Sequence, residues 1–276
     1  MTMIFEVRSI YRLHYKRWKS IFPSFYLAFL YCFLENALRE GTVFYLVNWK
    51  GNTLWNKVSI ILSVLGLDGY FSYLRPNYYI LGEWFLGAIL ILYLIYPLVL
   101  RIFEKSVIVV LIVCLAGFCA ANSGIFLINP FQNIFSCLLS FVIGMVIEKY
   151  NLVNNKKLAV GSTVIFIFLL LVPLGQQDFF VECMRYISGF CCLFFLYAVG
   201  YFVMREKHLA ALFSEVGNIS YCIFLLQHLI ILHILAYFSP TEPFKVILLL
   251  GITMMYTCIM AKVLWIVTNF ILKSKW

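Results

Sequence analysis

Long apolar runs separated by short polar segments dominate the chain. A helix needs about 20 apolar residues to cross the roughly 30 Å hydrocarbon layer of a bilayer. Suitable runs lie at about residues 20–38, 81–101, 106–121, 131–148, 158–175, 184–203, 217–238 and 244–262. We therefore predict an all-α protein, a polytopic transmembrane helix bundle of about eight spans, in which 106–121 is the weakest span.

Prolines refine the expected helix ends. Pro23 and Pro130 are expected where helices start, because the first turn of a helix loses nothing when an N–H is missing. Pro97 falls in the last turns of its run and is expected to kink or end that helix. After Lys262, the remaining apolar stretch either continues the last helix or turns along the membrane interface, and the lysine can snorkel in both cases.

Basic residues at the ends of the runs alternate between the two sides of the predicted bundle. Cytoplasmic loops retain Lys and Arg during membrane insertion. One side carries Arg8, Arg12, Lys16, Arg17, Lys19, Arg101, Lys105, Lys149, Lys156, Lys157, Arg205, Lys207, Lys273 and Lys275. This side is expected to be cytoplasmic, together with both termini. Residues 57–67 are too short to cross, so residues 39–80 are expected to form one extracytoplasmic segment whose middle packs against the membrane or dips into it.

The composition indicates a membrane protein and argues against a soluble protein, a nucleic-acid-binding protein and a metal-binding protein. The chain of 276 residues is 64% hydrophobic and only 12% charged, whereas a soluble surface needs roughly a quarter of residues charged. The net charge of +9 is explained by topology, so we expect no nucleic-acid partner. Most cysteines lie inside apolar runs without ligand spacing, which indicates small core residues and no metal site. The N-terminus has no secretory signal pattern, and residues 1–276 are expected to form a single domain.

A basic stripe precedes the first predicted span. Arg8, Arg12, Lys16 and Lys19 recur at helical spacing, with Arg17 beside them. Such a stripe holds phosphate oxygens by charge-assisted hydrogen bonds and suits a phosphorylated donor. It equally suits a topology anchor that prefers anionic lipid head groups, so charge alone leaves both interpretations open.

The external segment carries a different kind of surface, rich in aromatic residues. It contains Trp49, Trp55, Tyr70, Tyr73, Tyr78 and Tyr79. Arg75, Asn77, Glu83 and Trp84 follow where this segment enters the second span. Aromatic rings with hydrogen-bonding groups suit a sugar ligand, and they also suit an interfacial belt.

His228 lies near the middle of the run 217–238. Ser220, Phe224 and Gln227 share its side at helical spacing. Ionisable groups within a membrane usually face a cavity or a partner. A hydrogen-bonded histidine of the core fits the same position, because a neutral imidazole costs far less than a charge.

Three stretches together resemble the membrane-bound acyltransferase-3 family. They are YKRWKSIFPSFY at 15–26, NYYILGEWFLGAILILYLIYPLVLRIFEK at 77–105, and GNISYCIFLLQHLIILH at 217–233, with a lesser match in SFVIGMVIEKY. The last of the three, with Ser220 and Tyr221, is similar to the family's late Ser-Tyr helix. Their order and spacing agree over essentially the whole chain.

The departures from the family pattern concern its catalytic residues. Members carry two further spans ahead of the one that matches 20–38, and the first of these holds an essential Arg and His. If the gene product starts upstream of Met1, we expect about 60 additional codons to encode two apolar helices with these residues. The late helix often has His where this chain has Gln227, beside His228. The principal catalytic residue of the family thus has no match here.

The resemblance implies an O-acyltransferase of the cytoplasmic (inner or plasma) membrane, inactive as given if the missing helices are required. It would transfer an acyl group, expected to be acetyl, from cytoplasmic acyl-CoA to an extracytoplasmic glycan hydroxyl. Acyl-CoA is then a co-substrate with no bound cofactor, and membrane lipid and a surface polysaccharide or its lipid-linked precursor are the other partners. Arg12, Lys16, Arg17 and Lys19 would hold the donor, Arg75 to Trp84 would orient the acceptor, and His228 is the candidate base. A glycan or lipid-carrier transporter or polymerase component without acyl transfer is the alternative, and a degenerate remnant without activity is a third.

Overall fold

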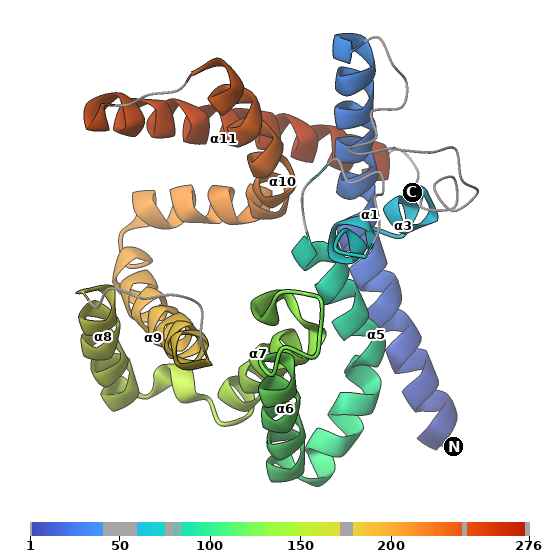
Figure 1. Cartoon of the computed structure of the whole chain (residues 1–276), viewed down its shortest axis with the longest axis vertical. Helices are drawn as coiled ribbons and strands as arrows, with labels where there is room; N and C mark the ends of the chain where they lie inside the picture. The colour runs from blue at the N-terminus through green and yellow to red at the C-terminus, as the bar shows by residue number, and fades with distance from the viewer. Residues whose placement is uncertain are drawn as a thin grey trace. The chain divides into compact units, whose positions relative to one another are not determined.

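The computed structural model describes residues 2–40, 60–74, 81, 84–171, 179–238 and 242–273, and these residues form helices and connecting turns without a strand. Figure 1 follows the chain from blue at the N-terminus to red at the C-terminus. A helix is found at each predicted apolar run, which confirms the all-α fold. These are α1 (Thr2–Glu40), α5 (Trp84–Lys105), α6 (Val107–Ala121), α7 (Ile134–Lys149), α8 (Lys156–Leu171), α9 (Phe179–Val203), α10 (Lys207–Tyr237) and α11 (Pro243–Lys273).

Several helices have the length and composition that a bilayer requires. Within the described residues, four helical segments are long and apolar enough to cross: Trp84–Lys105, Phe179–Val203, Lys207–Leu235 and Pro243–Lys273. Val107–Ala121 and Lys157–Leu171 are shorter apolar helices. Large apolar side chains such as Leu94, Leu171 and Phe270 are exposed, which suits a surface solvated by lipid and not by water. The chain is a membrane protein, while eight spans and cytoplasmic termini stay predictions.

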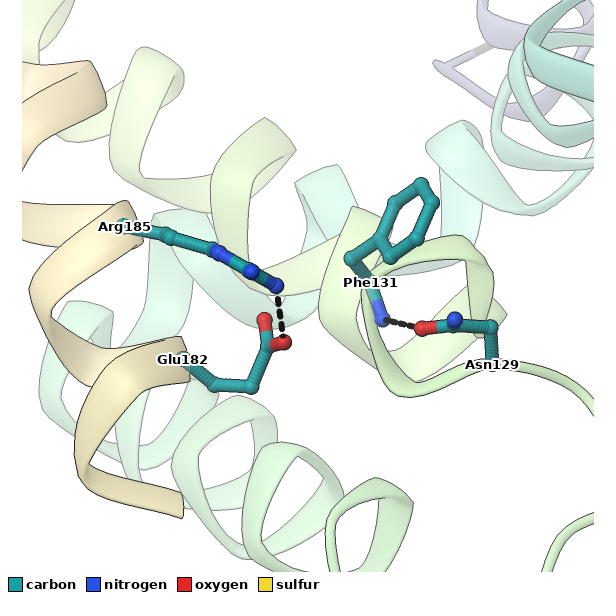
Figure 2. Close-up of polar contacts among 4 residues, drawn as sticks. All are labelled: Asn129, Phe131, Glu182 and Arg185. Atoms are coloured by element: carbon teal, nitrogen blue, oxygen red, sulfur yellow. Dashed lines mark hydrogen bonds and ion pairs between the residues drawn. The ribbon is translucent and has the colours of Figure 1, made fainter. Parts of the chain in front are cut away.

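One of the proline predictions is wrong. Pro23 lies inside α1, which begins far upstream at Thr2, so it does not start a helix. Pro97 lies inside α5, which continues to Lys105, so it does not end that helix, and a kink there stays a prediction. Apolar helices tolerate an internal proline because neighbouring helices and local adjustment compensate for the lost backbone bond. Pro130 does start a short 3-10 helix, η1 (Pro130–Gln132), where Asn129 Oδ1 accepts a bond from the Phe131 amide at 3.3 Å (Figure 2).

The end of the chain resolves an alternative that the sequence left open. Residues after Lys262 continue the last helix, because α11 extends to Lys273. The Lys262 ammonium forms an ion pair with Glu215 of α10 and lies 4.7 Å from the centre of the Trp265 ring. The lysine therefore binds a carboxylate and an aromatic face.

The short segment between α1 and α5 packs against α5. It forms α3 (Ile60–Val64) and α4 (Asp68–Phe71), joined by a turn in which Gly66 has φ of +70°. A helix of five residues is far too short to cross a membrane, in agreement with the prediction for 57–67. Gly87 lets α4 approach closely, because a Cβ at this position would lie 2.5 Å from Tyr70 Cβ. The segment is thus docked on a helix by a contact that needs a glycine.

Asp68 in this segment makes stability depend on pH. The residue is 7% exposed, and burial raises the pKa of its carboxyl from 3.8 to about 6. The Gly69 N–H donates a hydrogen bond to Asp68 Oδ1 at 2.9 Å, which lowers the pKa but offsets only part of the effect of burial. Because the folded pKa is raised, the folded state favours the protonated acid, and stability is lost as pH rises from about 4 through about 6.

We predict that Asp68→Asn is more stable than wild type at pH 7.5, by at most about 3 kcal/mol for a shift of roughly two pKa units. The advantage should shrink towards pH 4, where the carboxyl of the wild type is protonated. Thermal unfolding of both proteins in detergent at the two pH values measures this difference. A stability gain of the same size at both pH values would contradict the prediction.

The chain divides into two compact units. The first comprises residues 1–97 and 215–276, and the second comprises 98–214. In the first, one apolar core joins α1, α5 and α10: Phe22, Phe25, Ala28, Cys32, Leu81, Leu86, Leu225, Leu226, Leu229 and Ile230. In the second, α6 packs on α7, and α8 packs on α9. The single domain over residues 1–276 stays a prediction.

Candidate functional site

The basic end of α1 precedes the part of the helix that enters the core. Residues 8–19 are helical, so the backbone has the periodicity that the predicted stripe requires. The side chains of Arg8 and Arg12 lie outside the described part. Lys16 and Arg17 are exposed, and Lys19 is half-buried. Lys16 and Arg17 are therefore accessible to a ligand or to lipid head groups.

Arg17 is held by a neighbouring helix. Its guanidinium lies 5.0 Å from the centre of the Tyr93 ring of α5. A cation over an aromatic face is attracted by the ring, and the contact leaves the planar donors of the guanidinium available for phosphate oxygens. One turn further along, Phe22 is buried in the core of the first unit. The basic end is thus fixed to α5 and to the bundle core.

The Ser-Tyr pair of α10 lies between the core and the surface. Ser220 Oγ donates to the carbonyl of Gly217 at 2.8 Å. The ring of Tyr221 stacks on Phe224 with ring centres 6.3 Å apart. Its hydroxyl is buried and has no hydrogen-bond partner within the described residues. A buried hydroxyl without a partner costs free energy, so the Tyr221 hydroxyl can still form a hydrogen bond that its packing does not supply.

His228 lies on the exposed side of α10. Ser220 and Gln227 are exposed as well, and Phe224 is half-buried. These residues therefore lie with His228 on one side of α10, as the helical spacing predicts. The opposite side is buried through Ile219, Cys222, Leu225, Leu226, Leu229 and Ile230. His228 is therefore not a core histidine in the first unit.

The predicted acceptor-side residues are described only in part. Trp84 is half-buried at the start of α5 and meets Phe85 edge to face, with ring centres 5.9 Å apart. Phe85 in turn contacts Phe224 of α10 at 5.9 Å. Arg75, Asn77 and Glu83 lie outside the described residues, so the gathering of this set stays a prediction.

A polar contact inside the first unit was missed from the sequence. Ser24 of α1 donates to Thr268 of α11 at 3.3 Å, and Thr268 donates to the carbonyl of Leu264 at 2.8 Å. The thiol of Cys222 on α10 also lies within hydrogen-bonding reach of Ser24. Small polar residues at membrane helix interfaces allow close packing and hydrogen bonding. The sequence feature that could have predicted these contacts is the presence of small polar residues inside the apolar runs.

A buried carboxylate in the second unit was also missed. Glu182, near the start of α9, is 3% exposed, and Oε1 accepts from Arg185 at 2.7 Å (Figure 2). The signal was a glutamate with an arginine three residues later at the beginning of an apolar helix.

Comparison with protein families gives one match across almost the whole chain. The acyltransferase-3 family, described as an acyltransferase domain, matches residues 1–265. The match covers the second compact unit and all of the first except residues 266–276. Comparison with curated proteins and with solved structures finds no match.

Proposed function

Because this chain belongs to the acyltransferase-3 family, we propose that it transfers an acyl group from cytoplasmic acyl-CoA to a glycan hydroxyl on the outer side of the membrane. The family match over residues 1–265 is the observation that carries this proposal. Acetyl is the expected acyl group, and a surface polysaccharide or its lipid-linked precursor is the expected acceptor. The cytoplasmic (inner or plasma) membrane is the expected location.

The donor end is assigned to the basic start of α1. Acyl-CoA carries phosphates that need cationic partners, and Lys16, Arg17 and Lys19 supply these in the N-terminal half of α1, with Arg12 one turn earlier. The contact of Arg17 with Tyr93 supports this assignment, because it orients the guanidinium before a ligand binds. A pre-oriented cation loses less freedom on binding than a mobile one.

The chemical step requires a proton acceptor. The acceptor hydroxyl oxygen forms a bond to the thioester carbonyl carbon, the carbon–sulfur bond breaks, and the thiolate of CoA leaves. The hydroxyl proton passes to a base and then to the departing thiolate. We assign the base to His228, which is exposed on α10 beside Gln227. Ser220 and Tyr221 lie on the same helix, and the buried hydroxyl of Tyr221 has no hydrogen-bond partner among the described residues.

The acceptor is assigned to the opposite end of the first unit. Trp84 and Phe85 form an aromatic pair at the start of α5. Aromatic faces with neighbouring polar groups suit the apolar and hydroxylated surfaces of a sugar ring. Arg75, Asn77 and Glu83 are the polar groups expected to complete this surface.

The proposal is tested by supplying labelled acetyl-CoA to membranes that contain the full chain. Label in envelope glycan, absent from membranes without the protein, is the expected result. Glycan export that continues without any label in the glycan would overturn the proposal and favour a transporter component. Unchanged envelope chemistry and export in a deletion strain would instead favour a remnant without activity.

We predict that Lys16→Ala with Arg17→Ala raises KM for acyl-CoA about 10- to 100-fold, because each lost charge-assisted bond costs roughly 1.5 kcal/mol. Initial rates at varied acyl-CoA measure this change. The matched control is Lys157→Ala with Lys207→Ala, which removes two other exposed lysines and the same net charge. A KM that is unchanged in the first variant, or raised equally in both, would contradict a specific donor site.

A further inference from the structure

Two cysteines on different helices of the second unit lie close together. Cys119 is near the end of α6, and Cys183 lies in the second turn of α9. Both are free thiols, and they are near enough to interact electrostatically. Cys119 is exposed, so it is not the small core residue that its apolar run predicted. The proposed function uses neither thiol.

A contact between aromatic rings joins the same two stretches of helix independently of the thiols. Phe118, next to Cys119, is buried and meets the Tyr186 ring edge to face, with ring centres 4.8 Å apart. The centre of the Phe179 ring lies 6.0 Å from that of Phe118. Cys183 comes four residues after Phe179 and three before Tyr186, so it shares their side of α9. The side of α9 that carries Cys183 is therefore the side that contacts α6.

Both thiols can be reached from outside the unit. Cys119 is exposed and Cys183 is half-buried, whereas Cys114 of α6 and Cys191 of α9 are buried. A thiol must be accessible to exchange with the disulfide of another molecule. Accessibility and closeness to a second thiol thus coincide at Cys119 and Cys183.

Other reactive or charged groups nearby have partners of their own. Cys137 of α7 donates to two carbonyls of η1, each at 3.8 Å. Glu182 interacts electrostatically with Cys183, and it accepts from Arg185 at 2.7 Å (Figure 2). Among the described residues, no group of three or more His, Cys, Asp or Glu is placed to hold a metal ion. The pair is therefore better suited to thiol chemistry than to metal binding.

The predicted topology places the pair where disulfides form. The end of α6 and the beginning of α9 are on the extracytoplasmic side in this topology. Glutathione and thioredoxin keep thiols reduced in the cytoplasm, and outside it disulfides form and persist. Two accessible, neighbouring thiols are expected to be oxidised there.

We propose that Cys119 and Cys183 form a disulfide that ties the end of α6 to the beginning of α9. The oxidant is a small-molecule or protein disulfide. The Cys119 thiolate attacks one of its sulfur atoms, the S–S bond of the oxidant breaks, and one thiolate leaves. The Cys183 thiolate then attacks Cys119 Sγ and displaces the second thiolate. The oxidant gains two electrons, and the protons of the two cysteines pass to the departing thiolates. This proposal does not rest on the proposed function.

The full chain is tested in the membrane of the cell that produces it. Free thiols are blocked with N-ethylmaleimide at lysis, and the purified chain is digested without reduction for mass spectrometry. We expect a linked pair of peptides that contains Cys119 and Cys183. The pair should disappear after dithiothreitol, in Cys119→Ser and in Cys183→Ser. Cys192→Ser is the control, because Cys192 is also half-buried on α9, and this variant should keep the link.

The link is also expected to stabilise the fold. Dithiothreitol should lower the midpoint of thermal unfolding of the wild type by at least about 5 °C, because a disulfide restricts the unfolded chain. The midpoint of Cys119→Ser should not respond. This comparison still decides the matter if Cys183→Ser does not fold, because Cys119 is exposed and its replacement leaves the packing intact.

Three results would overturn the proposal. The first is a wild-type chain in which N-ethylmaleimide has modified both Cys119 and Cys183. The second is a linked peptide that joins either of them to Cys137. The third is an equal response of wild type and Cys119→Ser to dithiothreitol. Acyl transfer is measured separately, so a failure of the proposed function leaves these results unchanged.

Discussion

Replacing His228 with alanine is expected to lower the rate of acyl transfer at least about 100-fold, because a positioned general base contributes roughly 10²- to 10⁴-fold. The residue is suited to a clean test because it is exposed on α10. The helix is fixed through its opposite side, where Leu225 and Leu229 are buried. The variant should therefore keep its stability while losing turnover.

His208→Ala is the matched control for this prediction. His208 lies on the same helix and is also exposed, but it is close to the helix start and outside the predicted span. Its replacement should leave both turnover and thermal unfolding unchanged. Wild-type turnover in His228→Ala would show that His228 is not the base, and an equal loss in both variants would indicate a general effect on α10.

Gly87→Leu is expected to destabilise the protein by roughly 3 kcal/mol or to prevent its folding, because overpacking a close contact forces backbone shifts. A Cβ at Gly87 would lie 2.5 Å from Tyr70 Cβ and 3.4 Å from Leu67 Cα. Neither of these atoms is the end of a flexible side chain, so α4 must move away from α5. The loss should be visible as a lower midpoint of thermal unfolding in detergent.

The same substitution at Gly144 separates packing from the general effect of a new side chain in a helix. Gly144 is a helical glycine of α7, and a Cβ there would meet no atom within 4 Å. Gly144→Leu should therefore unfold at the temperature of the wild type. Equal midpoints for Gly87→Leu and Gly144→Leu would contradict the docking of α4 on α5.

The apolar runs predicted the helices well because membrane insertion depends mainly on the local sum of hydrophobicity. The same pattern failed at Pro23, which lies inside α1, whereas Pro97 lies inside α5 without ending it. The prediction used a rule for isolated helices, in which proline is found at helix ends because it lacks the N–H that an internal position needs. Within a bundle, neighbouring helices compensate for the missing bond, and the sequence does not say which helices are neighbours.

In the candidate site too, features within one helix could be predicted from the sequence, whereas contacts between helices could not. Helical spacing correctly placed Ser220, Gln227 and His228 on one side of α10. It did not predict the Arg17 contact with Tyr93 of α5, which joins residues far apart in the chain. Glu182 was missed for this reason too, since its burial depends on packing that no local pattern contains.

The central claim is that the donor end and the acceptor side lie on opposite faces of the membrane. Compartment-sensitive reporters inserted next to Ile60 of α3 and next to Val153 in the 3-10 turn Leu152–Asn154 measure it directly. The predicted topology places the first reporter outside and the second in the cytoplasm. Two reporters in one compartment would contradict the account.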